Sequence, residues 1–291
     1  MTTATRAKNL VRIGRMTTRA PLHALKNLQR LKYLRERAKF PLANFVAKHH
    51  IYQESEKFIL KTAETQFELR QMLKLRHDIF YTEWQGKETE DKLDVDAMDN
   101  LCDHLIIIDK ASSKVVGTYR VISSTFSKNF YSESEFHVGA FLNAPGNKLE
   151  LGRACIHKDF RNGAIINLLW KGISAYIKAT DSQYLFGCAS ALTAEPLLAS
   201  KILSYLKKEG FYSDEYAIRP TEKYLSPITD QEVDASIVNE VPALIQSYMK
   251  AGAKFYGNPA LDRDFDCYDY FMVLKIEEMN PLFKRRLGLD K

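Results

Sequence analysis

The sequence lacks any apolar run long enough to span a bilayer, and its N-terminus has no continuous apolar stretch. A membrane-spanning helix needs about 20 consecutive apolar residues, so we expect a chain that does not cross the membrane. A secretory signal also needs an apolar segment, so we expect a cytoplasmic location. The 291 residues are 45% hydrophobic and 27% charged, which is typical of a globular protein with a sizeable core.

Cysteine is scarce, and its four copies are scattered without a CxxC pair. Cys155 and Cys188 lie in apolar, strand-like segments, which indicates small core residues in a reducing compartment. No group of cysteine and histidine has the spacing of a zinc site, so we expect no bound metal.

The glycine-rich motifs of nucleotide-binding proteins, GxGxxG and GxxxxGK followed by Ser or Thr, are both missing. Their absence disfavours a nucleotide-binding fold. No helix-turn-helix or RNA-binding signature is present either, so we expect no nucleic-acid partner. A non-enzymatic module that binds an anionic surface such as nucleic acid is the alternative from a different functional class.

Positive charge is concentrated at one end of the chain. Residues 1–50 hold 12 Lys/Arg and a single acid, Glu36, whereas the other 241 residues hold 30 Lys/Arg and 35 Asp/Glu. We therefore predict a basic helical arm over residues 1–55 and a main domain over residues 56–291. The helix expected over 21–39 is imperfectly amphipathic, which fits packing on the main domain as well as binding to anionic lipid or an acidic partner.

Strand-like and helix-like patterns alternate along the main domain, with hairpins at both ends. This arrangement predicts an α/β (α+β) fold, a mixed central sheet with helices on both faces. Residues 125–147 are long and irregular, which is typical of a functional loop. The predicted strands are 57–62, 105–109, 115–123, 149–156, 184–189, 254–256 and 268–276, and the predicted helices are 67–84, 164–178, 196–208 and 243–251.

The most informative segment, Leu149–Trp170, reads as a strand, a polar turn and a helix. The turn is Arg161-Asn162-Gly163-Ala164. Free backbone N–H groups in a glycine-containing turn at a helix N-terminus favour a phosphate group, and the arginine adds a charged contact. Many strand–turn–helix units contain one glycine, so the turn by itself does not identify a ligand.

The strand in this segment carries both Glu150 and Arg153, and each charge is costly to bury unless it is paired. Strict alternation places the two on opposite faces, but Gly152 indicates a bulge that brings them to one side. Two interpretations stay open: a structural ion pair, or an acid/base group beside a substrate anchor. Burial raises the pKa of a carboxyl group, which suits a general base near neutral pH.

Eight segments, taken in their order and spacing, match one family. They are Arg76-His-Asp-Ile-Phe80 with Trp84; Asp94, Asp96 and Asp99 before Cys102-Asp-His104; Val116-Gly-Thr-Tyr-Arg120; Glu150-Leu-Gly-Arg153; Leu168-Leu-Trp170; Phe186-Gly-Cys-Ala-Ser190; Val241-Pro-Ala-Leu-Ile-Gln-Ser-Tyr248; and Asp262-Arg-Asp-Phe265 with Asp269. Over about residues 57–283 the chain resembles the GNAT-related bacterial N-acyltransferases that form lipids. It is most similar to the ornithine–acyl-carrier-protein N-acyltransferases, some of them labelled hemolysin-like, and more distantly similar to acyl-homoserine-lactone synthases and long-chain N-acyl amino acid synthases.

The resemblance implies a GNAT-like fold, in which two neighbouring parallel strands splay apart and hold the pantetheine arm of the acyl carrier. Here those strands would be 149–156 and 184–189, and the turn 161–164 would hold the phosphate. The turn departs from the usual pattern, which has two small residues around a variable one after the basic residue. The residues implied to contact the phosphopantetheine are Gly152, Cys155, Arg161, Asn162, Gly163, Ala164, Gly187 and Ser190.

The implied reaction moves a fatty acyl group, in this family often 3-hydroxylated, from a thioester to the amine of an amino acid such as ornithine. The ammonium must lose a proton before its nitrogen attacks, and Glu150 is the expected general base. His104 and His157 flank strands beside the expected site and are alternative bases. Backbone N–H groups at the bulge are expected to stabilise the oxyanion.

The acceptor's carboxylate is expected to bind Arg153 and Arg120, because the planar guanidinium pairs with a carboxylate through two hydrogen bonds. Asp96 and Asp99 are expected to receive a second amine if the acceptor is ornithine. The residues alone favour a solvated acidic loop for these two aspartates.

We expect no permanently bound cofactor. The acyl-phosphopantetheine thioester of acyl carrier protein, or acyl-CoA, would be a co-substrate. Aromatic residues of the long loop are candidates for an acyl tunnel: Phe126, Phe130, Tyr131, Phe136 and Phe141.

The expected partners are acyl carrier protein, a small amino acid and an anionic membrane surface, the last bound through residues 1–50. Acyl carrier proteins are strongly acidic, so the basic arm suits both the carrier and a peripheral position on the inner face of the membrane. Two other enzymatic interpretations remain: an acyl-homoserine-lactone-type signal synthase that uses S-adenosylmethionine, and a short-chain acetyl-CoA N-acetyltransferase.

Overall fold

The computed structural model describes residues 42–290, and within them a compact unit begins at Asn44. The helix predicted over 21–39 and most of the basic segment 1–50 lie outside the described residues. The backbone N–H groups of Lys48 and His49 donate to the carboxylate of Asp103, so the chain contacts the sheet before the first strand.

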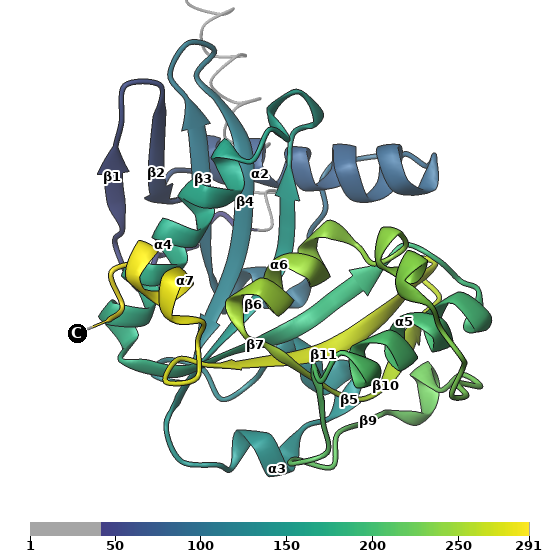
Figure 1. The fold of residues 1–291 in the computed structure, drawn as a ribbon. Helices are drawn as coiled ribbons and strands as arrows, with labels where there is room; N and C mark the ends of the chain where they lie inside the picture. Colours follow the sequence, from purple (N-terminus) through teal and green to yellow (C-terminus); the bar gives the residue numbers. More distant parts are fainter. Residues whose placement is uncertain (1–41, 291) are drawn as a thin grey trace, which may run out of the picture. The chain divides into compact units, whose positions relative to one another are not determined.

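The centre of this unit is a nine-stranded sheet with the order β1-β2-β3-β4-β6-β7-β11-β10-β8 (Figure 1). Its strands are β1 (Tyr52–Glu54), β2 (Phe58–Thr62), β3 (Asp103–Asp109), β4 (Lys114–Ser123), β6 (Asn147–Ile156), β7 (Ser182–Ala191), β8 (Tyr212–Ser213), β10 (Lys254–Asp262) and β11 (Cys267–Lys275). Neighbouring strands are antiparallel, except that β6 with β7 and β10 with β8 are parallel. The predicted mixed sheet is therefore confirmed.

Helices cover the sheet. They are α2 (Gln66–His77), α3 (Gly139–Leu142), α4 (Ala164–Thr180), α5 (Pro196–Lys208), α6 (Ala243–Ala251) and α7 (Pro281–Arg286). In α4, Ile165, Leu169, Ile173 and Tyr176 recur at helical spacing and are fully buried in the main core, whereas Leu168, expected on the same face, is only partly buried. Among the described residues, no helix is long and apolar enough to cross a membrane.

The helix predicted over 67–84 changes its winding part of the way along. Thr65 caps α2 in a capping box with Glu68, and the α-helix ends at His77. The chain continues as a π-helical turn, η1 (Asp78–Glu83). Wider turns of this kind frequently occur at functional sites.

The parallel strands β6 and β7 separate partway along their length. Their pairing ends at Glu150 opposite Phe186, although both strands continue beyond this point. Figure 1 shows the two strands side by side at one end and diverging toward the other. Gly187 lies where they part, and a Cβ atom there would be 2.2 Å from the carbonyl oxygen of Leu151. The splayed pair that the resemblance implied is thus present.

Residues 125–147 contain short elements: the 3-10 helix η3 (Tyr131–Ser134), the strand β5 (Phe136–His137) and α3. The strand pairs with β9 (Arg219–Pro220) in a separate two-stranded sheet. Phe130, Phe136 and Phe141 are buried in a second hydrophobic core, where they pack against aromatic rings of β7 and β11. Three of the five aromatic residues suggested for an acyl tunnel are therefore core residues.

Candidate functional site

A cleft of about 540 Å³ opens where β6 and β7 diverge. Its walls come from β4, β6, β7, β11, α4, α6 and the π-helical turn η1. The apolar wall includes Phe80, Trp84, Leu169 and Leu192, and the polar wall includes several charged side chains. A largely apolar cleft with a few convergent polar groups is the usual form of a small-molecule site.

The predicted bulge in β6 is present and lies at Arg153. The pairing of β4 with β6 gains one extra β6 residue between Gly152 and Cys155, and Arg153 adopts a positive φ of 48°. Such a backbone conformation is uncommon for a non-glycine residue and often marks a functional position. As a result Glu150 and Arg153 both line the cleft. They do not form an ion pair with each other, because the ion pairs of Arg153 are with Asp94 and Asp96, as described below.

The carboxylate of Glu150 is buried and held by a short loop. Its Oε1 accepts from the backbone N–H of Ser132 at 2.7 Å and from the Ser132 hydroxyl at 2.5 Å. Its Oε2 accepts from the backbone N–H of Tyr131 at 2.7 Å. Burial raises the pKa of Glu150, and these hydrogen bonds offset the rise only in part.

Arg76, on α2, lies at the centre of a buried ion-pair network. Its Nε is 2.6 Å from Asp94 Oδ2, and its Nη1 is 2.7 Å from Asp99 Oδ1. All three side chains are at most 2% exposed. Burial alone would raise the pKa of Asp99, but the charges of Arg76 and Arg120 reverse the effect and lower it. Asp99 therefore stays ionised.

The network continues to the cleft through two more arginines. Arg120 Nη1 lies 2.6 Å from Asp96 Oδ2, and Arg153 Nη2 lies 3.1 Å from the same oxygen. Arg153 Nε lies 3.4 Å from Asp94 Oδ2. Arg120 Nη2 is buried and has no hydrogen-bond partner among the described residues. Asp96 and Asp99, suggested for a second amine, thus neutralise arginines, and the network leaves an unused guanidinium N–H.

The residues suggested for the carrier divide into two groups. Gly152, Cys155, Arg161, Gly163 and Ser190 line the cleft, whereas Asn162, Ala164 and Gly187 do not. The guanidinium of Arg161 already pairs with Glu83 through two contacts of 2.6 and 2.8 Å.

The turn before α4 has little side-chain capping. Gly163, the N-cap residue, has no side chain to offer and adopts a φ of 87°, while the Ala164 N–H donates to the Asn162 side chain. The first N–H groups of a helix have no partner within the helix, so this end of α4 retains the character of an anion site.

The two histidines considered as alternative bases lie away from the cleft lining. His104 is fully buried, and burial lowers its pKa to about 4. The side chain of His157 lies beside that of Asp159, and both are substantially exposed to solvent.

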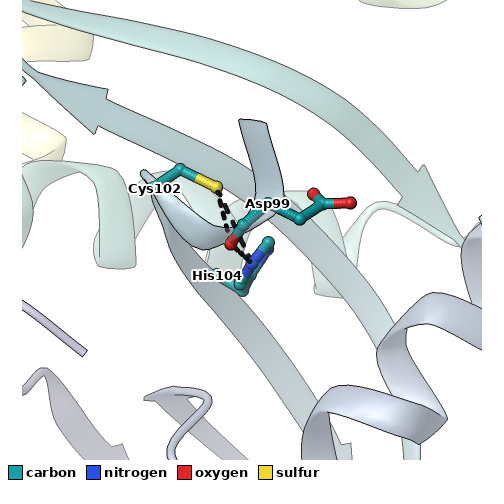
Figure 2. A group of neighbouring side chains, drawn as sticks. All are labelled: Asp99, Cys102 and His104. Carbon is teal, nitrogen blue, oxygen red and sulfur yellow. Dashed lines mark hydrogen bonds between the residues drawn. The ribbon is translucent and has the colours of Figure 1, made fainter. Parts of the chain in front are cut away.

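His104 also belongs to a cluster with Asp99 and Cys102, shown in Figure 2. Its Nε2 lies 3.0 Å from the carbonyl oxygen of Asp99, and the Asp99 carboxylate points away from both other side chains. That carboxylate is paired with Arg76 and Arg120, and burial raises the pKa of the Cys102 thiol. A carboxylate that two guanidinium groups already occupy is a poor ligand for a metal ion.

The sequence analysis assigned no role to several residues of the cleft. Asp262 and Asp269 line it, and Glu135 is buried beside them. A clue for Asp269 was present, because a single acid interrupts the apolar strand Cys267–Lys275. Tyr131 was suggested for an acyl tunnel; instead its ring lies over the guanidinium carbons of Arg120 and Arg153, at 5.2 and 5.1 Å.

Residues 75–171 match the model of the acetyltransferase (GNAT) domain. The matched segment begins in α2, ends in α4, and contains the splayed strand β6 with Glu150 and Arg153. The protein is therefore an acyltransferase, and its mixed sheet with a splayed parallel pair is a GNAT-like fold.

The chain is also similar to several named proteins. The chain is 29% identical over 238 residues to the L-ornithine N(alpha)-acyltransferase of Agrobacterium fabrum, covering 75% of this chain and 81% of the relative. It is 28% identical over 250 residues to the enzyme of the same name from Brucella abortus, covering 79% of this chain and 89% of the relative. Among solved structures, the CoA-dependent acyl-homoserine lactone synthase BjaI matches with a TM-score of 0.45 and 16% identity, covering 78% of this chain and 84% of that one.

Proposed function

We propose that the protein transfers a fatty acyl group from a phosphopantetheine thioester to the α-amine of ornithine, forming a lyso-aminolipid. The observation that carries this proposal is the position of Glu150, which stands where β6 and β7 part, within the same cleft as Arg120 and Arg153. The names of the relatives suggest the acceptor, since they are L-ornithine N(alpha)-acyltransferases.

The acyl donor enters between the splayed strands in this proposal. Edge N–H and C=O groups that no longer pair across the opening are free to bind the amide groups of pantetheine. The phosphate then lies at the N-terminus of α4, near Gly163 and Arg161. The pair of Arg161 with Glu83 is on the surface, where such pairs contribute at most about 1 kcal/mol, so a phosphate can displace Glu83.

The carboxylate of the acceptor binds Arg120 and Arg153. Arg120 Nη2 is the one guanidinium nitrogen of that residue left buried without a partner, and a buried donor of this kind gains most from a charged acceptor. Tyr131 covers both guanidinium groups and fixes their planes. The acceptor is thereby oriented with its α-amine toward Glu150.

Glu150 acts as the general base, directly or through one water molecule. A carboxylate offers about four lone-pair sites, and three of those of Glu150 are filled by Tyr131 and Ser132. The remaining site takes a proton from the α-ammonium group, and the freed nitrogen attacks the thioester carbon. The new C–N bond forms, the C–S bond breaks, and the thiolate leaves and takes up a proton.

The basic segment 1–50 brings the enzyme to its two anionic partners, acyl carrier protein and the cytoplasmic face of the membrane. Its 12 Lys/Arg against one acid give an attraction of this kind, while the product needs a membrane to accept its acyl chain.

Mass spectrometry of lipids from cells that overproduce the protein tests the proposal, with a Glu150→Gln strain beside the wild type. We expect a new N-acyl ornithine in the wild type and none in the variant. Absence of any new lipid in both strains contradicts the proposed function. The same lipid in both strains preserves the function and removes Glu150 from the mechanism.

A further inference from the structure

Two aspartates form one end of the polar wall of the cleft. Asp262 ends β10 and Asp269 lies on the neighbouring strand β11, and both are 4% exposed. Asp262 Oδ1 accepts from the backbone N–H of Asp264 at 2.8 Å, and Asp269 Oδ1 accepts from the Ser190 hydroxyl at 2.5 Å. Neither carboxylate forms an ion pair with any residue that the structure describes.

A third carboxylate, that of Glu135, lies behind them. Glu135 is fully buried, and neither of its oxygens has a hydrogen-bond partner among residues 42–290. Burial raises the pKa of Glu135, and the charges of Asp269 and Asp262 raise it further. The nearby Tyr131 and Cys188 side chains offset this rise only in part, and neither forms a hydrogen bond of normal geometry with Glu135. A buried carboxyl group in this state gains from a cationic ligand.

The distribution of charge in the cleft indicates that this ligand is positively charged. The three arginines of the network are balanced by three aspartates, Asp94, Asp96 and Asp99. Glu135, Asp262 and Asp269 lie outside this balance, and no cationic side chain of the described residues lies at ion-pair distance from them. A cation bound there would let carboxyl groups whose pKa is raised ionise. A ligand that is cationic at this end satisfies them.

The shape of the cluster favours an ammonium group. An ammonium group has three N–H donors, and the two aspartates present free acceptor capacity toward the cleft, with Glu135 behind them. Asp262 and Asp269 also lie with Cys267 within reach of a single metal ion. Treatment with EDTA, described below, distinguishes a metal ion from an ammonium group as the ligand of this cluster.

We propose that Asp262 and Asp269, supported by Glu135 behind them, bind the distal ammonium group of the acceptor and select diamino acids over neutral ones. The inference rests on the proposed function and names the class of acceptor. It also gives the distal amine a site other than Asp96 and Asp99, whose carboxylates are occupied by arginines. The distal amine stays protonated there, and the α-amine is the one left to react.

The test compares ornithine with norvaline, which has the same carbon skeleton and no distal amine. In the wild type we expect kcat/KM for ornithine to exceed that for norvaline roughly 10- to 100-fold, the range for a lost charge-assisted hydrogen bond. In Asp262→Asn and in Glu135→Gln the ratio should fall toward 1 through loss of ornithine turnover alone. Asp264→Asn is the matched control, since its side chain is 77% exposed two residues from Asp262.

Binding of the two amino acids by calorimetry, with a thermal unfolding scan of each variant, separates lost selectivity from lost folding. Equal turnover of norvaline and ornithine by the wild type overturns this inference and leaves amino-acid acylation intact. Turnover of neither overturns the proposed function and the inference with it. Loss of ornithine preference on treatment with EDTA assigns the cluster to a metal ion and overturns the inference as well.

Discussion

Two groups of buried charges adjoin the cleft, and they are neutralised in different ways. In the first, Arg76, Arg120 and Arg153 meet three aspartates at distances between 2.6 and 3.4 Å. In the second, the carboxyl groups of Glu150, Glu135, Asp262 and Asp269 have no cation within ion-pair distance among the described residues. The pKa of Asp96 and Asp99 in the first group is lowered by the neighbouring arginines, whereas burial raises the pKa of Glu150, Glu135 and Asp269 in the second.

We interpret the paired network as structural and the unpaired carboxyl groups as the ones that take part in the reaction. A fully paired network keeps its charges at any physiological pH and fixes the positions of α2, β4 and β6. Unpaired carboxyl groups destabilise the fold, because burial favours their neutral form. In the proposed reaction, the ligands supply the missing proton or cation.

Removal of the base gives the largest expected effect. We expect Glu150→Gln to lower kcat by about 10²- to 10⁴-fold, the usual contribution of a general base, with little change in ornithine binding. Glu277→Gln, at an exposed position in the turn that follows β11, serves as the control. A kcat within a few-fold of the wild type would place Glu150 among the structural charges.

The pH dependence of kcat is a second test of Glu150 as the general base. Activity should fall as the pH drops through the pKa of Glu150, and burial raises that pKa. The acidic limb of the wild-type profile should therefore lie above the value of an ordinary glutamate, about 4.3. A limb at or below that value contradicts a buried carboxylate base.

Loss of an arginine from the paired network should lower the stability of the fold. We expect Arg76→Met to lower the free energy of unfolding by about 3–5 kcal/mol, because it leaves Asp94 and Asp99 buried with less compensation. Lys74→Met on the same helix removes an exposed pair with Asp78 and should cost less than about 0.5 kcal/mol. Urea unfolding measures both, and equal losses would show that burial of the network is unimportant.

Removal of a carboxyl group that has no ion-pair partner should raise the stability of the fold instead of lowering it. Burial raises the pKa of Asp269 from 3.8 to about 6, so its contribution to stability is present at low pH and is lost as the pH rises through about 6. Asp269→Asn should therefore be more stable than the wild type at about pH 8, with the gain disappearing near pH 4. Thermal unfolding at both pH values measures this, and a variant that is less stable at the higher pH refutes it.

The smallest effect is expected at the exposed ion pair between Arg161 and Glu83. Arg161→Ala should raise KM for the acyl carrier about fivefold or less, since a surface contact contributes little, and should leave kcat unchanged. Glu83→Gln frees Arg161 from its competitor and should lower that KM or leave it unchanged. Shifts in the same direction for both variants would contradict a phosphate contact at Arg161.

The fold was largely predictable because its strong signals are local. Apolar periodicity predicted α4, α5 and α6, and short apolar runs predicted most strands of the central sheet. Together they predicted the succession of these elements along the chain. Two short edge strands, β1 and β8, were missed, since three and two residues carry too little pattern. The π-helical turn after α2 was also missed, because it continues a helical apolar pattern without a break.

The site was predictable only where charge interrupts an apolar strand or where the resemblance marks a position. Glu150, Arg153 and Arg120, which line the cleft, were predicted in that way. Asp94, Asp96 and Asp99 looked like a solvated loop, because their arginine partners come from three distant segments and only the tertiary structure joins them. Glu135 gave no signal, since it stands among polar residues of a loop.

One measurement tests the central claim most directly. Purified protein is given ornithine labelled with ¹⁵N at the α-nitrogen, together with a 3-hydroxyacyl thioester of acyl carrier protein, and the product is fragmented by mass spectrometry. The account predicts an amide bond at the labelled nitrogen, because Glu150 activates the α-amine while the acidic cluster holds the distal amine protonated. An amide at the unlabelled nitrogen, or no amide at all, would contradict it.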